Sequence, residues 1–532
     1  MRTSLHAAAI VLLLAGCVTV PSRQVPVFSE TVPFVGPPRI EVRSDAIRVP
    51  AGADVIELVV HAPPGATFVF ETGVHRLERP IVPRTGDTFI GEPGAVLSGA
   101  LSVEADGREG DLWFVADLPL DLSTHGNCRR DRPRCNVRHD LFLDDVALQH
   151  VPTVHDVITG TWTFDADAGR VYLADDPSER RLEVSVAMGA IVGAADDVTV
   201  AYLTIERFAN PAQRGAVMAE RVGSPTVFGQ RWTIVGNEVR WNHGVGIRAG
   251  GGSWIVTNHV HHNGQLGIAS VGPGPTRVEA NEIAFNNVAG YADTWEAGGT
   301  KFVRTDGLLV RHNHVHHNDG PGLWTDIDNV RTVVEHNLVE HNASTGIFHE
   351  ISFDAVIRGN EVRYNGLAIG LERYAYVFGA GILIANSQNT TVYANRVVGN
   401  WNGILGLHQD RGSGALGAYV LRNVTVFDNT VWMPYHADGI GPTGQRGVTS
   451  MSGVAQSGGF DEVFGAAYGN RFFDNRYVVA DPQRRHFRWN NATLTFSAWQ
   501  RCGSSSGASD SCRQDAEGSL LQDPAVQDLP RR

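Results

Sequence analysis

A six-residue motif, N-x-[VIL]-x-x-N, recurs seven times between Asn237 and Asn400. Its copies are NEVRWN, NHVHHN, NEIAFN, NHVHHN, NLVEHN, NEVRYN and NRVVGN, and their leading Asn residues follow one another by 21, 23, 32, 24, 23 and 35 residues. A nearly fixed period in this range indicates a repeat architecture, in which each repeat buries its apolar side chains against its neighbours. This feature constrains the fold more than any other.

The content of each repeat favours short strands. A Gly stands nine residues after the leading Asn in five repeats, and Ile or Leu follows it in all but the Gly290 repeat: Gly246, Gly267, Gly290, Gly322 and Gly346. The apolar runs are short, β-branched and interrupted by Gly and Asn, which disfavours a helical solenoid. We expect the leading Asn residues to stack in turns and exchange amide hydrogen bonds. The sequence predicts an all-β fold, a right-handed parallel β-helix.

The rest of the chain divides around this solenoid. The 532 residues, 42% of them hydrophobic, suffice for a long solenoid core and an inserted domain. Strand signals in residues 40–100 predict an N-terminal cap and the first coils. Residues 101–186 lack the Asn repeat and contain hairpin-like turns, which predicts an inserted β-sandwich-like domain. We expect the main β-helix over residues 187–480 and a cap over residues 481–532 that covers its open end.

The first residues read as an export signal. Arg2 precedes an apolar stretch that ends in the sequence Leu14-Ala15-Gly16-Cys17. This sequence resembles the signal of bacterial lipoproteins, with Cys17 as the lipidated residue of a signal peptide over residues 1–17 and a linker over residues 18–39. The alternative is an ordinary signal peptide with an incidental Cys. We therefore expect an exported protein, lipid-anchored in the cell envelope, and by this resemblance in the outer membrane facing the periplasm or the cell surface.

Four further cysteines form two local couples. Cys128 lies near Cys135 in the sequence, and Cys502 lies near Cys512. Pairing within each couple suits an oxidising compartment. A metal site is the alternative, but neither couple has the C-x-x-C spacing. We expect two disulfides.

Two acids occupy the same phase of consecutive repeats. Asp326 lies 13 residues after Asn313, and Glu350 lies 13 residues after Asn337. In a parallel solenoid the two carboxylates would stack one strand spacing apart, at ~4.8 Å. A retaining glycosidase holds its carboxyl pair at roughly 5–5.5 Å. Two like charges so close also split their titration, which leaves one acid and one ionised base or nucleophile. An irrelevant pair on a solvated face is the alternative.

The two longest steps of the repeat flank this acid pair. The first added segment contains YADTWEAGGTKF and supplies Trp295, Glu296 and Lys301. The second contains LERYAYVF and supplies Arg373 and Tyr374, with Glu372 and Tyr376 beside them. Loops carried on a regular scaffold are where binding residues concentrate. We expect these residues to bind substrate, the aromatics by stacking on sugar faces.

Histidines cluster in the two NHVHHN copies, which invites a metal interpretation. The cluster holds His259, His261, His262, His314, His316 and His317, with His312 just before. We expect strand alternation to divide them between faces, so stacking on the outside of the coils is predicted, with no metal site. His349 differs because it precedes Glu350, and it lines the cleft if the backbone turns there.

The segments WEAGGTKF, GLWTD and GIFHE, in this order, resemble glycoside hydrolase family 120. The resemblance implies a right-handed β-helix interrupted by a β-sandwich and the activity of a retaining β-xylosidase. It also implies that Asp326 is the nucleophile, Glu350 the acid/base, and Glu296 and Lys301 substrate-binding residues. Its specific lettering is concentrated in about 60 residues.

The sequence thus favours a retaining glycoside hydrolase that acts on oligosaccharides derived from plant or microbial polysaccharides, without a cofactor. One alternative is a polysaccharide lyase or uronate epimerase, which would recruit Lys301, Arg373, Tyr374 or His408 and for which the acid pair could bind calcium. Another is a non-catalytic glycan-binding surface solenoid. The net charge of −13 argues against a nucleic-acid partner, and the lipid anchor is the only membrane contact expected.

Overall fold

A computed structural model describes residue 36 and residues 40–221, 223–224, 226–489, 491–501 and 514–528. Residues 39–532 form one compact unit. The signal segment with Cys17, nearly all of the predicted linker, Cys502 and Cys512 lie outside the described residues, so lipid attachment and the second disulfide stay predictions. None of the described helices combines the length and the apolar content that crossing a bilayer would require.

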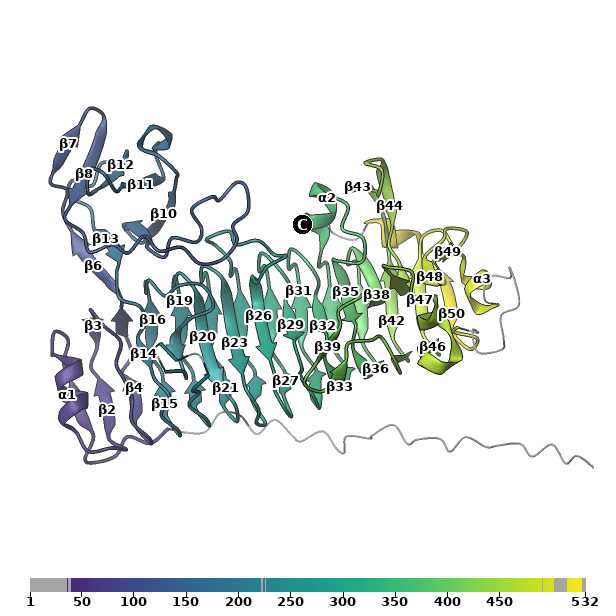
Figure 1. The fold of residues 1–532 in the computed structure, drawn as a ribbon, viewed down its shortest axis with the longest axis horizontal. Coiled ribbons are helices and arrows are strands. Elements are labelled where there is room, and N and C mark those ends of the chain that lie inside the picture. The colour runs from purple at the N-terminus through teal and green to yellow at the C-terminus, as the bar shows by residue number, and fades with distance from the viewer. Residues whose placement is uncertain are drawn as a thin grey trace, which may run out of the picture. The chain divides into compact units, whose positions relative to one another are not determined.

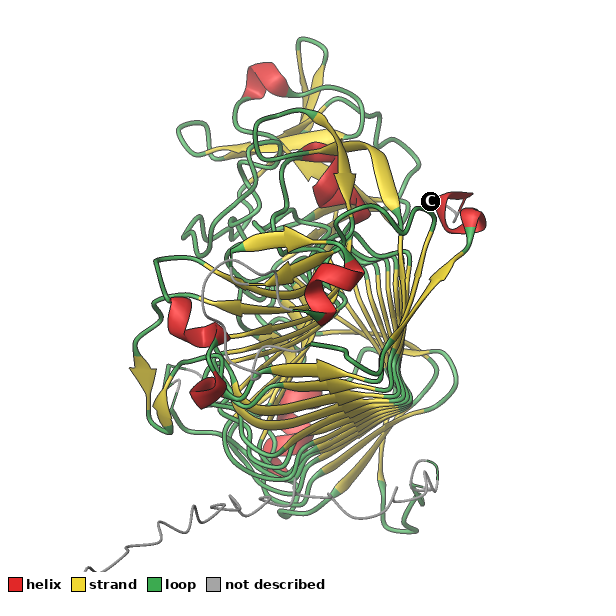
Figure 2. Ribbon diagram, turned by 90° about the vertical axis from the view of Figure 1, so that its right-hand side faces the viewer, coloured by secondary structure: helices red, strands yellow, loops and turns green. Residues whose placement is uncertain are grey.

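Each repeat folds into a coil of three short strands, and the coils stack into three long sheets (Figures 1 and 2). Sheet 1 runs in the order β1 (Ile47–Val49), β2 (Thr67–Phe70), β4 (Thr88–Gly91), β15 (Thr199–Ala201), β18 (Thr233–Val235), β21 (Trp254–Val256), β24 (Arg277–Glu279), β27 (Leu309–Arg311), β30 (Thr332–Glu335), β33 (Phe353–Arg358), β36 (Gln388–Tyr393), β41 (Thr425–Phe427) and β46 (Arg471–Phe473). Its strands pair in parallel.

Sheet 2 contains both acids of the predicted pair. Its order is β14 (Ile191–Val192), β17 (Gly215–Met218), β20 (Val245–Gly250), β23 (Leu266–Val271), β26 (Gly298–Val303), β29 (Leu323–Asp326), β32 (Ile347–Glu350), β35 (Ala380–Ala385), β38 (Asn402–His408), β45 (Ser452–Gln456), β48 (Phe487–Trp489) and β49 (Ala492–Leu494). The last pair, β48 and β49, is antiparallel.

Sheet 3 contains the strands of the Asn motif. Its order is β3 (Gly73–Arg76), β5 (Ala95–Ser98), β16 (Thr204–Glu206), β19 (Glu238–Arg240), β22 (His259–His261), β25 (Glu282–Ala284), β28 (His314–His316), β31 (Leu338–Glu340), β34 (Glu361–Arg363), β37 (Arg396–Val398), β42 (Thr430–Met433), β47 (Arg476–Val479) and β50 (Ser519–Gln522). The prediction of a parallel β-helix is confirmed.

The Asn residues of the motif form hydrogen-bonded ladders between coils, as predicted. Asn313, for example, donates its backbone N–H and its side-chain amide to Asn337 Oδ1, at 3.0 and 2.9 Å. The seven leading Asn residues form this ladder, and Asn429 and Asn475 of later coils extend it: Asn237, Asn258, Asn281, Asn313, Asn337, Asn360, Asn395, Asn429 and Asn475. The trailing Asn residues form a second ladder through Asn242, Asn263, Asn286, Asn318, Asn342, Asn365 and Asn400. Both ladders satisfy buried backbone groups at turns, which an apolar side chain would leave unpaired.

The core is a column of apolar side chains inside the three sheets. The third residue of each motif, and Val431 of the next coil, point inward and belong to one continuous cluster: Val239, Val260, Ile283, Val315, Val339, Val362, Val397 and Val431. Burying each such side chain contributes about 1.5–3 kcal/mol. Each copy of the motif therefore supplies one inward apolar residue and two Asn residues of the ladders.

Both ends of the column are covered. At the N-terminal end, α1 (Val55–His61) buries Val55 and Val59 in the core cluster, and Asp54 caps its first turn by accepting from Glu57 N at 3.1 Å. At the other end, α3 (Phe496–Gln500) places Trp499 against Phe487, with ring centroids 4.4 Å apart. Covering the ends prevents pairing between molecules at open sheet edges.

The segment between the first coils and the main β-helix forms a separate sheet. Its order is β6 (Ala100–Val103), β13 (Leu182–Ser185), β9 (Leu141–Leu143), β10 (Val146–His150), β11 (Thr161–Asp165), β12 (Arg170–Leu173), β8 (Leu112–Ala116) and β7 (Gly107–Glu109). Both halves of this sheet contribute to one hydrophobic cluster, with Leu141 and Val184 from one half and Trp162 and Leu173 from the other. We call this segment the inserted domain.

Shorter elements decorate the coils. They are α2 (Leu367–Glu372), the hairpins β39–β40 (Ser413–Gly414, Gly417–Ala418) and β43–β44 (Tyr435–Ile440, Arg446–Thr449), and the 3-10 turns η1 (Val154–Asp156), η2 (Asp461–Phe464), η3 (Ala466–Tyr468) and η5 (Pro524–Asp528). Because α2 and β39–β40 follow strands of the coils next to the predicted acids, they decide what surrounds that site.

Candidate functional site

The two predicted acids end adjacent strands of sheet 2. Asp326 is the last residue of β29 and Glu350 the last of β32. These strands pair in parallel, with Thr325 opposite His349, so the same register sets Asp326 opposite Glu350. Neighbouring strands lie ~4.8 Å apart. Because Leu323 belongs to the core, strand alternation directs Asp326 away from the interior.

The backbone turns sharply directly after each acid. Ile327 has φ 62° and Ile351 has φ 35°, the left-handed region that β-branched residues avoid. Such conformations cost of order 1–3 kcal/mol each and persist only where the surroundings hold them. A third ladder provides that hold, because Asn329 accepts from Thr305 N at 3.1 Å and donates to Ser352 Oγ at 3.1 Å. The ends of both acid-bearing strands are therefore fixed in place.

Asp326 is held by a lysine. Lys301 Nζ lies 2.9 Å from Asp326 Oδ2 and 2.8 Å from Glu296 Oε1, and it also sits 4.0 Å from the centre of the Trp324 ring. The other carboxylate oxygen, Oδ1, is buried and accepts no hydrogen bond from the described residues. A buried oxygen without a partner is costly, and in native proteins such exceptions often mark catalytic groups.

Glu296 is held by a polar chain that reaches the inserted domain. Gln213 donates to Glu296 Oε2 at 2.7 Å, and His125 lies 3.0 Å from Gln213 Oε1. Gln265 donates to the Glu296 carbonyl at 2.8 Å. The lysine beside Asp326 is thus positioned by groups from distant parts of the sequence.

Glu350 has different surroundings. It accepts a hydrogen bond from the Trp324 indole N–H at 3.2 Å and forms an ion pair with Arg411. Burial raises the pKa of Glu350, the charge of Asp326 raises it further, and Arg411 and Lys301 oppose the rise, with a net shift upward. The two carboxyls therefore differ, since Asp326 faces a lysine while the pKa of Glu350 is raised.

Arg411 was not predicted from the sequence. It lies between β38 and β39, just before the β39–β40 hairpin. Asp328 anchors this hairpin, because it accepts from Ala415 N in the turn and from Tyr419 Oη directly after β40, each at 3.0 Å. Asp328, out of register with the acid pair, thus has a structural role. The only sequence signal for Arg411 was the added length between β38 and β41, which breaks the coil period.

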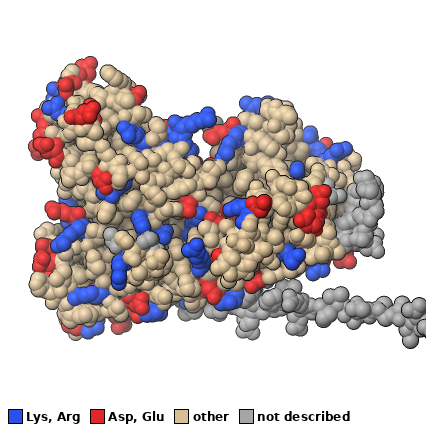
Figure 3. Space-filling view, viewed as in Figure 1, with Lys and Arg blue, Asp and Glu red and all other residues tan. Residues whose placement is uncertain are grey.

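The two acids open into a cleft of about 480 Å³. Asp293 and Trp295 line it from the first added loop, and Arg373, Tyr374 and Tyr376 from the second. Arg373 donates to both carboxylate oxygens of Asp293 at 3.0 Å, so the two loops join beside the cleft. The surface is hollowed between the inserted domain and the region of α2 and β43, and charges of both signs are interspersed around it (Figure 3).

The predicted binding residues take three kinds of position. Trp295, Arg373 and Tyr374 line the cleft. Glu296 and Lys301 are not among the lining residues and act on Asp326 from its side. His349 does not line the cleft: the strand stays regular, so its side chain faces Thr325 inside the coil at 2.7 Å, and burial lowers its pKa to about 3.

His408, considered for a lyase, is also buried. Its Nδ1 accepts from Leu421 N at 3.0 Å, and its ring packs against Phe460. It is not among the residues that line the cleft. In the described part of the chain, the groups of His and Glu side chains that could hold a metal ion lie on sheet 3. Neither Asp326 nor Glu350 belongs to such a group.

The first predicted disulfide, Cys128–Cys135, is confirmed. The loop that this disulfide closes packs against the first added loop. The backbones of Cys128 and Tyr291 form an isolated antiparallel β-bridge, and Ala292 N donates to the Asn127 carbonyl at 2.9 Å. The Trp295 ring stacks on Tyr291 and meets His125 edge-on. The inserted domain therefore supports one wall of the cleft.

Comparison with known proteins supports the fold. A family model described as a right-handed β-helix region matches residues 226–397. A solved structure of XylC in complex with xylose is 16% identical, covers 71% of this chain and 72% of its own, and superposes with a TM-score of 0.56. No curated protein sequence matches the chain.

Two further solved structures superpose less closely. One named a glycoside hydrolase is 10% identical, with a TM-score of 0.41 over 69% of this chain and 86% of its own. The A-module of a mannuronan C-5 epimerase from Azotobacter vinelandii is 13% identical, with a TM-score of 0.39 over 80% of this chain and 87% of its own. The coil geometry, the family model and the likeness to XylC together show that this chain folds as a right-handed parallel β-helix.

Proposed function

We propose that this protein is a retaining glycoside hydrolase. One observation carries the proposal: Asp326 and Glu350 end adjacent strands in register and line one cleft, with unlike electrostatic surroundings. One strand spacing, ~4.8 Å, is close to the roughly 5–5.5 Å carboxyl separation of retaining enzymes and short of the roughly 6.5–9.5 Å of inverting ones.

The surroundings also support the division of roles. Lys301 faces Asp326 and stabilises its carboxylate, which suits a nucleophile. The raised pKa of Glu350 suits a general acid. In the first step Asp326 would attack the anomeric carbon while Glu350 gives its proton to the departing glycosidic oxygen. In the second, Glu350 would take a proton from water, which attacks the glycosyl ester and frees Asp326.

The cleft supports a sugar substrate. Trp295, Tyr374 and Tyr376 offer aromatic faces, and Arg373 offers donors for hydroxyl groups. The likeness to the structure of XylC with xylose makes a β-xyloside the first substrate to test. The substrate class is then an oligosaccharide derived from a polysaccharide.

The test uses aryl β-xylosides and aryl α-L-arabinofuranosides with the wild type, Asp326→Asn and Glu350→Gln. We expect each substitution to lower kcat/KM by about 10²–10⁴-fold or more, because each removes a proton-transfer or nucleophilic group. Arg373→Gln, in the same cleft but outside the acid pair, is the control and should lose less. Wild-type turnover in both acid variants would refute the site.

Four further measurements separate the mechanism from its alternatives. The first product should keep its anomeric configuration, and an inverted product would refute double displacement even if hydrolysis occurs. Azide should restore turnover to the acid/base variant with a glycosyl azide of retained configuration, whereas rescue of the nucleophile variant would give the inverted azide. A lyase would instead produce an unsaturated uronate, and an activity that chelators abolish would favour the calcium-dependent alternative.

We also propose that the protein is exported and lipid-anchored through Cys17 in the cell envelope. The L-A-G-C sequence motivates this, and the Cys128–Cys135 disulfide suits an oxidising compartment. Mass spectrometry of the mature N-terminus would show a diacylated or triacylated Cys17. A mature chain that begins elsewhere and partitions with the soluble fraction would refute it.

A further inference from the structure

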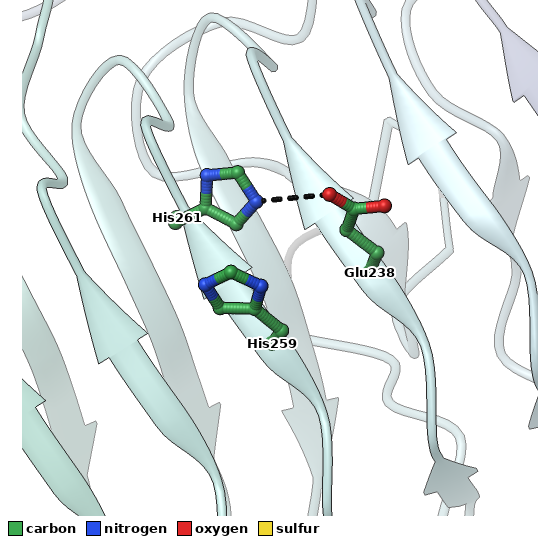
Figure 4. A group of neighbouring side chains, drawn as sticks. All are labelled: Glu238, His259 and His261. Atoms are coloured by element: carbon green, nitrogen blue, oxygen red, sulfur yellow. Dashed lines mark hydrogen bonds and ion pairs between the residues drawn. The ribbon is translucent and has the colours of Figure 1, made fainter.

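Two matching groups of His and Glu lie on the outer face of sheet 3, among the residues that the structure describes. One joins Glu238 of β19 to His259 and His261 of β22 (Figure 4). We call it the upstream cluster. The other, the downstream cluster, consists of Glu282, His314 and His316. In each, one ligand atom per residue lies within 4.8 Å of the others.

The β-helix produces these groups by register. Glu238 pairs with His259 across β19 and β22, and Glu282 pairs with His314 across β25 and β28. The second histidine of each group lies two residues further along its strand. The expectation that alternation separates these histidines is wrong for both pairs, because positions two apart in a strand share one face.

The side chains already converge. His261 Nε2 lies 3.2 Å from Glu238 Oε1, and the rings of His259 and His261 stack with centroids 4.0 Å apart. Downstream, His316 Nε2 lies 3.1 Å from Glu282 Oε1. A tetrahedral zinc ion with bonds of about 2.0–2.1 Å needs ligand atoms about 3.4 Å apart. The His261–Glu238 and His316–Glu282 separations are already close to that value.

One position distinguishes the two clusters. Arg240, two residues after Glu238, donates to Glu238 Oε1 at 2.7 Å. Ala284 takes the equivalent place after Glu282. A guanidinium on the ligand carboxylate competes with a metal cation and repels it. The downstream cluster is free of this competition at that position.

A second carboxylate lies near each cluster. Upstream, Glu282 Oε2 is 3.8 Å from His259 Nε2. Downstream, Glu340 Oε1 is 2.9 Å from His314 Nε2, although Arg363 also pairs with Glu340. The downstream cluster therefore has the closer additional acid, and its ligand carboxylate, Glu282, contacts histidines where Glu238 also contacts Arg240.

We propose that Glu282, His314 and His316 form a surface site for a divalent transition-metal ion such as Zn²⁺, and that the upstream cluster is a weaker copy of it. Two imidazoles and one carboxylate are a ligand set that suits zinc, with water completing the coordination. The ion would join β25 to β28, which are consecutive coils on either side of the long loop that carries Trp295. The site is separate from the acid pair, so the proposal does not depend on the proposed hydrolase activity.

The experiment titrates metal-free full-length protein with ZnCl₂ by calorimetry and with CoCl₂ by absorbance. We expect one dominant equivalent of bound metal per protein, with the absorbance bands of tetrahedral cobalt. The double variant His314→Ala/His316→Ala should abolish this binding. The matched variant His259→Ala/His261→Ala should keep it. Ala284→Arg should weaken it at least tenfold by copying the upstream arginine, while Arg240→Ala should add a second equivalent.

Circular dichroism of each variant controls for folding, which matters for Ala284→Arg because Ala284 is buried and for Arg240→Ala because Arg240 also pairs with Glu206. The proposal fails if neither metal binds at micromolar concentration or if the two histidine double variants lose binding equally. It also fails if Ala284→Arg binds as tightly as the wild type. Two equally tight equivalents in the wild type would overturn the ranking of the clusters.

Discussion

At the residue scale, the site depends on giving two identical functional groups different neighbours. Asp326 lies 2.9 Å from an ammonium group, whereas Glu350 is buried, near a like charge, and bonded to an indole N–H at 3.2 Å. In the sequence the two acids differ only by one methylene and by position. The cations that face them, Lys301 at Asp326 and Arg411 at Glu350, are brought together by the fold from different coils.

Arg411→Met tests this account of Glu350. Arg411 lowers the pKa of Glu350 against the larger upward effects of burial and Asp326. Removing the cation should raise that pKa further, so the fraction of protonated acid persists to higher pH. The basic limb of kcat/KM should therefore move to higher pH, measured with an aryl glycoside whose poor leaving group makes protonation limiting.

Arg373→Met is the matched control, since Arg373 lines the same cleft but pairs with Asp293. Its pH profile should keep the wild-type basic limb even if KM rises. A basic limb that moves to lower pH in Arg411→Met, or stays in place, would contradict the assignment of Glu350 as the acid.

At the element scale, the coil derives its regularity from the Asn ladders. Asn337 accepts the backbone N–H and the side-chain amide of Asn313 and donates to Asn360 Oδ1 at 2.9 Å. Each rung thus fixes the spacing of two coils at a turn. Because both acids follow such turns at the same offset, the ladder also fixes their register.

Asn337→Ala should destabilise the protein by about 3 kcal/mol. The substitution strands the buried backbone N–H of Asn313 and removes a side chain that is 2% exposed, and unsatisfied buried groups cost about 1–3 kcal/mol each. Urea unfolding followed by circular dichroism measures the change. Asn127→Ala, at an exposed position, should shift the midpoint by far less, and equal midpoints for the two variants would contradict a structural role for the ladder.

At the scale of the whole molecule, the sequence predicts the features that the repeat sets, and it does not predict the residues that irregular loops bring to the site. The motif period predicts the three-sheet coil, the ladders and the pairing of Asp326 with Glu350, because a solenoid converts a sequence offset into a distance. It does not predict Arg411 or Gln213, which reach the site through loops of irregular length. For His349, alternation within a regular strand already implied an inward side chain.

The inserted domain gives the last prediction, because its disulfide loop supports the cleft from outside the coils. The loop closed by Cys128 and Cys135 contacts the segment that carries Trp295 and Glu296. Closing a loop this short contributes about 2–3 kcal/mol by limiting the unfolded loop. In Cys128→Ser/Cys135→Ser the loop should open locally, so KM should rise several-fold while the main β-helix keeps its thermal transition. Hydrogen exchange should quicken in residues 125–137 and 287–297 and stay unchanged in sheet 3.

Arg170→Ala, in β12 of the same domain, provides the control, since Arg170 pairs with Glu109. If KM and exchange in the double variant match those of Arg170→Ala, the disulfide loop does not support the cleft, and its contacts with the first added loop are incidental to substrate binding.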